Sequence, residues 1–106
     1  MYIYNVTIKI TKEKSEAWQT WLNEEHLQDV LKTKCFFQAN FFKLLEPKTD
    51  DDDDSDTFVV QYFCNTEKDY ENYILNFSET LRKKGEEKFG GHFIGFRSFM
   101  KMLKTL

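Results

Sequence analysis

Cysteine is scarce in this sequence, which has only Cys35 and Cys64 among 106 residues. The two thiols are far apart and form no CxxC pair, so the sequence implies neither a disulfide framework nor a thiolate metal site. We expect both to be reduced and half-buried. If the strands flanking an acidic loop pair as a hairpin, residues whose numbers add up to about 100 lie opposite each other, which brings the two thiols close together. A cross-strand disulfide is a minor alternative.

The sequence also lacks an excess of basic residues. Lys and Arg number 15 against 18 Asp and Glu, which gives a formal net charge of −3. Because binding to a phosphate backbone needs clustered Lys and Arg, this balance argues against a nucleic-acid partner. No G-x-G-x-x-G, P-loop or G-x-S-x-G motif occurs, so nothing supports nucleotide or serine-hydrolase chemistry, and we predict no cofactor.

Long apolar runs are missing as well. No run approaches the length that spans a membrane. The first ten residues, MYIYNVTIKI, have no basic n-region, no long apolar h-region and no small-residue cleavage site. We therefore expect a cytoplasmic protein with no membrane partner.

Aromatic residues, by contrast, are abundant. Eleven Phe, five Tyr and two Trp make up 17% of the chain, so we expect a core of large rings rather than of aliphatic side chains. A chain of this length folds as one domain and buries about two-thirds of the surface that the unfolded chain exposes. We assign residues 1–106 to a single domain without internal repeats.

Four segments have the periodicity or composition of β-strands. The first alternates strictly, with Tyr2, Tyr4 and Val6 on one face and Asn5 and Thr7 on the other. The predicted strands are residues 2–10, 35–45, 57–64 and 92–103. Pro47 ends the second strand, and the charged segment 47–56 is predicted to be an exposed hairpin loop. In the last strand, Gly95 suggests a bend or bulge.

Two segments show helical spacing. The first follows Thr11 as a possible cap and runs to about Leu27, with residues 28–34 as a connection. The second begins with the T-x-x-D signal at Thr66 and carries apolar residues at i, i+3, i+4 and i+7. Its basic last turn precedes Gly85, which we interpret as the stop, with a short frayed turn beyond it as an alternative.

The resulting order, β-α-β-β-α-β, defines the fold class. It is the split βαβ pattern of ferredoxin-like α+β domains, in which a four-stranded antiparallel sheet carries both helices on one face. The strands nevertheless place apolar residues on both faces, so the second face needs a cover. A homodimer formed through the open sheet face, a dimeric α/β barrel, is the economical cover and is the partner that we predict.

His26 is the strongest candidate for a catalytic residue. It is the one side chain with a pKa near neutrality on the inner stretch of the first helix, where it could act as a base or orient a ligand. The alternative is a structural histidine at the helix end, stabilised by the helix dipole. Trp18 and Trp21 would line a cavity next to it, although rings at helical spacing also form ordinary cores.

Polar residues in the middle of strands are the other candidates. Asn5, Gln61 and Arg97 could bind a ligand in a cavity, or could instead pair across strands or face solvent. A metal site is not predicted: the acidic residues around His26 point in different directions around a helix, and no second histidine lies at i+4. The run Asp50 to Asp54 lacks the D-x-D-x-D-G spacing of a calcium loop.

A resemblance to a known family rests on five stretches of the sequence. They are IYNVT from Ile3, W-x-x-W-L-x-x-E-H-L-x-D-V-L from Trp18 to Leu31, KCFFQANFFKLLE, VQYFC followed by D-Y-x-x-Y, and the closing KFG…F-R-S-F. Together they resemble a bacterial family of short chains known only as a domain of unknown function. That family is similar to the dimeric α/β-barrel superfamily, which includes cofactor-free monooxygenases of the antibiotic-biosynthesis type and muconolactone-isomerase-like enzymes. No catalytic residue set of those enzymes matches position by position.

Three hypotheses for the function follow. The leading one is a homodimeric barrel domain that binds a small, partly apolar molecule or serves as an interaction module. The second is a cofactor-independent monooxygenase- or isomerase-like enzyme in which His26 is the general base and Asn5, Gln61 or Arg97 orients an enolate or carbonyl oxygen. The third is a structural dimer with a filled interior. The sequence alone does not decide whether the protein is an enzyme.

Overall fold

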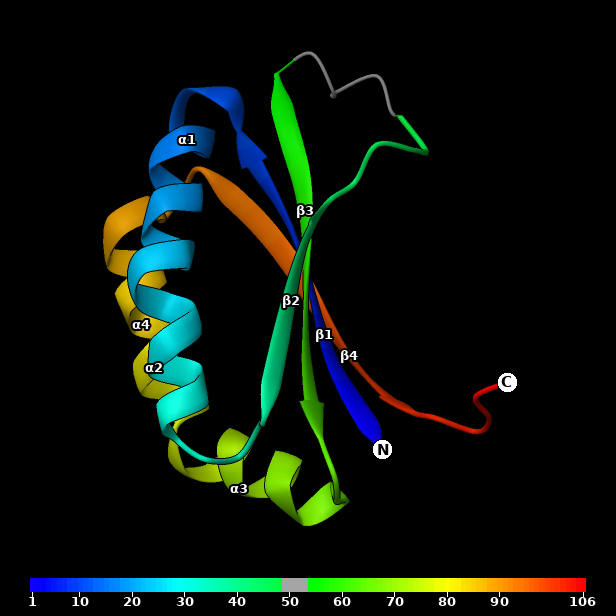
Figure 1. The fold of residues 1–106 in the computed structure, drawn as a ribbon. Helices are drawn as coiled ribbons and strands as arrows, with labels where there is room; N and C mark the ends of the chain where they lie inside the picture. The colour runs from blue at the N-terminus through cyan, green and yellow to red at the C-terminus, as the bar shows by residue number, and fades with distance from the viewer. Residues whose placement is uncertain (49–53) are drawn as a thin grey trace.

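A computed structural model describes residues 1–48 and 54–106, and its four strands form one antiparallel sheet in the order β2-β3-β1-β4. In chain order the elements are β1 (Tyr2–Thr11), α1 (Lys12–Trp21), the π-helical segment η1 (Leu22–His26), α2 (Leu27–Lys32), β2 (Gln38–Lys43), β3 (Ser55–Cys64), α3 (Glu67–Asn76), α4 (Ser78–Phe89) and β4 (Phe93–Lys101). The helices cover one face of the sheet (Figure 1). The predicted ferredoxin-like α+β fold is confirmed.

The central strand β1 separates the two faces of the sheet. Its even-numbered residues point to the helices; Tyr4 and Ile10 among them are buried, as are Phe58 and Val60 of the neighbouring strand β3. Successive residues of a strand point to opposite faces, so the odd-numbered residues of β1, such as Asn5, lie on the face without helices. The alternation read from the sequence thus assigns the core.

Aromatic rings fill the space between sheet and helices, as predicted. The ring of Tyr4 lies within 5.8 Å, centroid to centroid, of those of Phe36, Tyr62, Tyr70 and Tyr73. Stacked and tilted contacts of this kind stabilise a core beyond the area that the rings bury. The core is therefore a network of rings centred on one residue of β1.

The first helical stretch is longer than predicted. Residues 28–32 belong to α2 and do not form a connection, so this prediction was wrong. The helix continues because Val30 and Leu31 keep helical spacing with the buried face and no Gly or Pro stops it; Val30 is fully buried. Thr33 ends it by donating its hydroxyl proton to the Val30 carbonyl at 2.7 Å. Thr11 precedes α1, but its hydroxyl makes no capping bond.

The second helical stretch differs from its prediction in two ways. Thr66 caps α3 as expected, because its Oγ1 accepts a hydrogen bond from the Asp69 backbone N–H at 3.2 Å. The helix then breaks at Phe77, whose φ of −128° is not helical, and α4 runs through Gly85 to Phe89. Gly85 is not a stop. It lies on the buried side of α4, where a Cβ atom would be 3.2 Å from the Trp21 ring.

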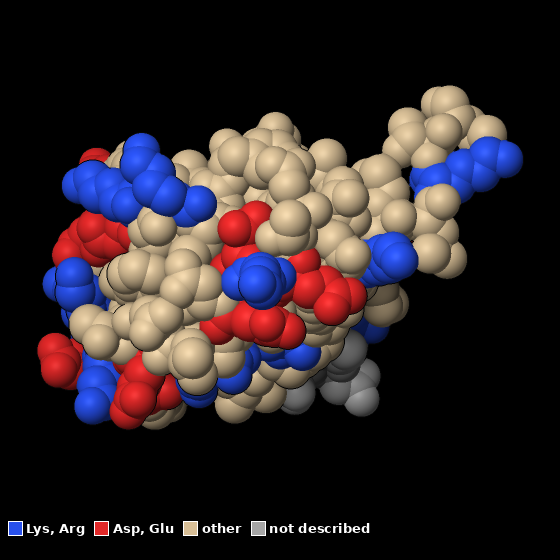
Figure 2. Space-filling model, turned by 90° about the horizontal axis from the view of Figure 1, so that it is seen from below, with Lys and Arg blue, Asp and Glu red and all other residues tan. Residues whose placement is uncertain are grey.

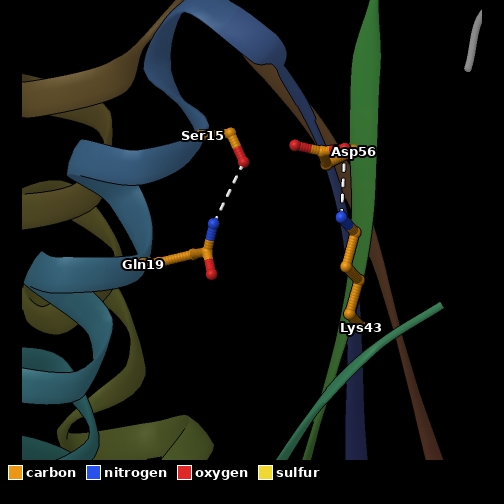
Figure 3. Close-up of polar contacts among 4 residues, drawn as sticks. All are labelled: Ser15, Gln19, Lys43 and Asp56. Carbon is orange, nitrogen blue, oxygen red and sulfur yellow. Dashed lines mark hydrogen bonds and ion pairs between the residues drawn. The ribbon is translucent and has the colours of Figure 1, made fainter. Parts of the chain in front are cut away.

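The strand boundaries also move. β2 covers only Gln38–Lys43 of the predicted 35–45, and β3 begins at Ser55, inside the predicted loop 47–56. Residues 49–53 of that loop lie outside the described part of the chain. Asp56, which was predicted to lie in the loop, belongs to β3 and forms an ion pair of 3.7 Å with Lys43 of β2 (Figure 3). The same figure shows the Ser15–Gln19 side-chain hydrogen bond on the sheet-facing side of α1.

β4 contains no bulge. It pairs with β1 residue by residue from Phe93 to Lys101, so the bulge suggested for Gly95 is absent. Gly95 instead allows close packing, because a Cβ atom there would lie 2.5 Å from Cδ1 of Ile8.

Both cysteines are free thiols in the interior. The β2/β3 register places Gln38 opposite Phe63, close to the register expected from the sequence. Cys35 and Cys64 are more deeply buried than predicted. The Cys64 thiol donates to the Thr66 carbonyl at 3.4 Å, and Asn72 donates to the Cys35 sulfur at 3.4 Å.

The face opposite the helices carries large apolar side chains. Ile94 and Phe96 of β4 are 72% and 65% exposed, and Phe42 of β2 is about half exposed. This is the face that the apolar pattern of the strands predicted to need a cover, and within one chain it is open. Residues 102–106 follow β4 and extend away from the helices (Figure 1). In the view from below, basic and acidic side chains are intermixed on the surface, and neither sign dominates (Figure 2).

Replacing Phe58 by Ala tests the aromatic core. The ring is 1% exposed and packs against Trp18 and Phe41, so we expect its removal to lower the free energy of unfolding by about 3–5 kcal/mol. Urea denaturation measures the change. The control is Leu75→Ala on α3, where the side chain is 84% exposed and the change should stay within about 0.5 kcal/mol. Equal losses in the two variants would contradict this description of the core.

Candidate functional site

A pocket of about 380 Å³ lies between the helices and the β1–β4 side of the sheet. This size falls in the range of small-molecule sites, which are about 300–1,000 Å³. Its walls combine aromatic rings with a few polar groups. The lining includes Tyr4, Trp18, Trp21, His26, Arg82 and Arg97.

The π-helical segment η1 explains how Trp21 and His26 come together. In a regular α-helix, residues five apart point in different directions because each residue turns the chain by about 100°. A π-helix closes its hydrogen bonds from i to i+5, as the Leu27 N–H does here with the Leu22 carbonyl. The Trp21 and His26 rings consequently stack, with centroids 4.7 Å apart. Single π turns of this kind occur frequently at functional sites.

His26 is not at a helix end, as the alternative interpretation required, but in the middle of a continuous helical stretch. Burial lowers the pKa of its imidazole from 6.5 to about 4; the nearby Asp29 opposes this shift and Lys84 adds to it. The ring is therefore neutral at pH 7. Its Nδ1 atom is buried and has no hydrogen-bond partner, and the same is true of Trp21 Nε1.

Two buried polar atoms without a partner on neighbouring rings are unusual, because an unsatisfied buried group costs about 1–3 kcal/mol. The indole N–H can only donate a hydrogen bond. The neutral imidazole can accept one at one of its ring nitrogens and donate at the other. Both atoms are buried, so neither offers an accessible hydrogen-bonding surface to the pocket.

Arg97 places a positive charge on the same pocket. Its Nη1 donates to the Ser78 hydroxyl at 3.2 Å and to the Tyr4 hydroxyl at 3.5 Å. The bond to Tyr4 raises the pKa of Arg97 further, while burial raises the pKa of the Tyr4 hydroxyl despite the nearby guanidinium. Arg97 is thus held by two neutral hydroxyls, which fix its position and leave its charge uncompensated.

Asn5 and Gln61 do not belong to this pocket. The register places Asn40, Gln61, Asn5 and Ser98 opposite one another on the four strands, in a polar row across the open face. Gln61 Nε2 donates to Asn5 Oδ1 at 3.3 Å. The alternative in which the strand amides pair across strands therefore describes these two residues, whereas Trp18, Trp21, His26 and Arg97 meet at the pocket.

The sequence analysis missed the contributions of α4 to the pocket. Arg82, Gly85 and Glu86 line it, but interpreting Gly85 as a stop left them outside any site. A signal was present in the spacing of the buried residues Ser78, Leu81, Gly85 and Phe89, which continues at three and four residues. Two of these residues are small, which leaves room for Arg97 at Ser78 and for Trp21 at Gly85.

In the part of the chain that the structure describes, no three His, Cys, Asp or Glu side chains lie close enough together to hold a metal ion. A search of the same residues finds no helix with the length and hydropathy required to cross a membrane.

Comparison with known proteins identifies the family. Residues 1–103 match the family described as domain of unknown function DUF4286, and the chain belongs to it. No curated protein matches the chain. The resemblance to a family of unknown function, inferred from the sequence motifs, is confirmed.

Solved structures with the same fold are distant in sequence. A dimeric ferredoxin-like protein from an uncultured marine organism is 14% identical with a TM-score of 0.68, over 100% of this chain and 98% of the other. A candidate antibiotic biosynthesis monooxygenase from Nitrosomonas europaea is 14% identical with a TM-score of 0.66, over 98% and 100%. SnoaB from Streptomyces nogalater, a cofactor-independent oxygenase, is 7% identical with a TM-score of 0.60, over 99% and 96%. Identities this low establish the fold alone.

The depressed pKa of His26 predicts how stability depends on pH. Between pH 6.5 and 4 the unfolded chain binds a proton that the folded chain does not, so the free energy of unfolding falls as the pH is lowered through this window. We expect the wild type to lose about 1–3 kcal/mol more than His26→Gln between pH 7 and pH 4. Urea denaturation of both proteins across this range measures the difference. Parallel pH profiles would show that His26 titrates normally.

Proposed function

We propose that this chain is a homodimeric barrel domain that binds a small, partly apolar molecule in the pocket between its helices and sheet. The observation that carries the proposal is the combination, in one pocket of about 380 Å³, of aromatic walls with the guanidinium groups of Arg82 and Arg97. Mostly apolar concave sites with a few polar groups are typical of small-molecule binding. A pocket of this volume also argues against the alternative of a filled interior.

Binding is favoured over catalysis by the electrostatics of His26. A general base works best when its pKa lies near the operating pH. With a pKa of about 4, the imidazole is a weak base for removing a proton from a substrate at neutral pH. The neutral ring is better suited to orient a ligand by hydrogen bonding and by presenting its stacked face with Trp21. The oxygenase activity named for SnoaB is a second candidate that rests on the fold.

The open sheet face supports the homodimer. Its exposed apolar residues Phe42, Ile94, Phe96 and Met100 come from strands at both edges of the sheet, and patches of this kind mark interaction sites. The C-terminal residues 102–106 extend on the same side of the sheet, and Leu103 among them is 88% exposed. We favour a second copy of this chain as the occupant of the open face. Most side chains of this face are apolar or neutral, and its amide groups can both donate hydrogen bonds to an identical face and accept them from it.

The polar row across this face fits a symmetric pair. Amides such as Asn5 and Gln61 both donate and accept hydrogen bonds, so a copy related by a two-fold axis can pair with them without burying a charge. Rows of apolar side chains lie on either side, including Val59 paired with Phe42. The row would fix how the two sheets align, whereas the apolar rows would supply the contact area.

A charge in the middle of the open face tests the dimer. We expect the wild type to have twice the 12.8 kDa mass of the chain in analytical ultracentrifugation. Val59→Lys should weaken the dimer by about a hundredfold or more, because it buries an unpaired ammonium group in the interface. The control is Leu75→Lys on α3, away from this face. A monomeric wild type would overturn the dimer.

Filling the pocket tests ligand binding. We expect native mass spectrometry of the purified protein to show extra mass of a few hundred daltons per chain, the size of a molecule that fits about 380 Å³. Gly85→Val should remove that mass, since its Cβ would already lie 3.2 Å from the Trp21 ring and push it into the pocket. Glu87→Val, with the same branched residue at an exposed position of α4, should keep it. Identical bound mass in both variants would contradict a ligand in this pocket.

A further inference from the structure

Two guanidinium groups stand together at the edge of the pocket. Arg82 of α4 and Arg97 of β4 line both the pocket and an adjoining hollow of about 400 Å³ between α4 and β4. Both guanidinium charges are close enough to Tyr4 and Tyr73 to oppose the rise in their pKa values. Burial, which raises these pKa values, remains the larger effect. A molecule that extends from one hollow to the other passes between these two charges.

Among the described residues, neither guanidinium forms an ion pair with an acidic side chain. Lys83 and Glu79, which also line the outer hollow, pair with each other at 3.7 Å. Glu86 also lines both hollows, so their shared wall carries two positive charges and one negative charge. The charge left over at the junction of the two hollows is positive.

An arginine held by hydroxyls is prepared to bind an anion. Ser78 and Tyr4 accept hydrogen bonds from Nη1 of Arg97, so a ligand can use the remaining N–H donors of the guanidinium without breaking an ion pair. Guanidinium groups match planar oxyanions, and hydrogen bonds between charged partners are about twice as strong as neutral ones. The inner pocket beyond the arginines is walled by Trp18, Trp21 and Tyr62.

We propose that the ligand is an aromatic acid, whose ring system occupies the inner pocket against Trp21 and His26 and whose anionic group lies between Arg82 and Arg97. This inference rests on the proposed small-molecule function and names its ligand class. The ring system accounts for the apolar walls, and the anion accounts for the net positive charge where the two hollows meet. A neutral ligand of the same shape would leave both guanidinium groups unused.

Two fluorescent probes with one ring skeleton separate the contribution of the charge. 1-Anilinonaphthalene-8-sulfonate carries an anionic group that N-phenyl-1-naphthylamine lacks. We expect the wild type to bind the sulfonate at least about tenfold more tightly. Arg97→Met and Arg82→Met should each weaken sulfonate binding about tenfold and change binding of the neutral probe less than about twofold. The neutral probe also reports whether each variant keeps a folded pocket, and exposed Arg82 can be replaced without disturbing the core.

Two control variants test whether the effect of the arginine substitutions comes from the loss of any positive charge or from the location of the probe. Lys88→Met removes one positive charge from an exposed position of α4 that lines neither hollow, and should leave the affinity for both probes unchanged. Phe42→Ser removes an apolar group from the open sheet face and should also have no effect. Sulfonate binding that is weakened by Phe42→Ser and unaffected by Arg82→Met would assign the probe to the open face and overturn the proposal.

The remaining outcomes separate the ligand class from the proposed function. Equal affinity for the two probes, unaffected by either arginine substitution, would overturn the aromatic acid while leaving a small-molecule pocket in place. Absence of binding for both probes, together with native mass spectra that show no retained molecule, would overturn the pocket function itself and the ligand class with it.

Discussion

The structure depends on one constraint: the helices cover only one face of the sheet, and β1 must divide its side chains between that face and the other. Tyr4 shows what the covered side gains. Its ring contacts four other rings in the core, and its hydroxyl accepts a hydrogen bond from Arg97 at 3.5 Å. The residue that organises the aromatic core therefore also positions a charge in the pocket. One residue later, Asn5 belongs to the open face and to the proposed dimer.

The sequence predicted the order of strands and helices well because period-2 and period-3.6 patterns are local. It failed where a local signal had two meanings. Gly85 is a common helix stop, but here the missing side chain makes room for Trp21. Residues 28–32 contain no strong helix signal of their own, and they are helical because Val30 completes the core. Tertiary packing decided both cases.

The candidate site was predicted only in part, because the position of Arg97 depends on the register between β4 and β1. Trp18 and Trp21 lie three residues apart on one helical stretch and could be grouped from spacing. Arg97 joins them only because β4 pairs Val6 with Arg97, which puts the arginine on the helix side, while the same register puts Ser98 beside Asn5 on the other side. A shift of one residue would exchange the two faces. No pattern within β4 itself fixes that choice, and the π turn that stacks His26 on Trp21 has no signature in the sequence LNEEH.

The π turn η1 could change during evolution without altering the rest of the fold. Regular helix lies on both sides of η1, and each side buries its own residues against the rest of the chain, Trp18 before it and Val30 after it. An i to i+5 turn holds one residue more than an α-helical turn, so losing one residue within Leu22–His26 could restore regular spacing without rotating either flank. The core would survive, and the stacked pair of rings would not. A single codon deletion or insertion could therefore remove or create the proposed binding site in a chain whose architecture stays the same.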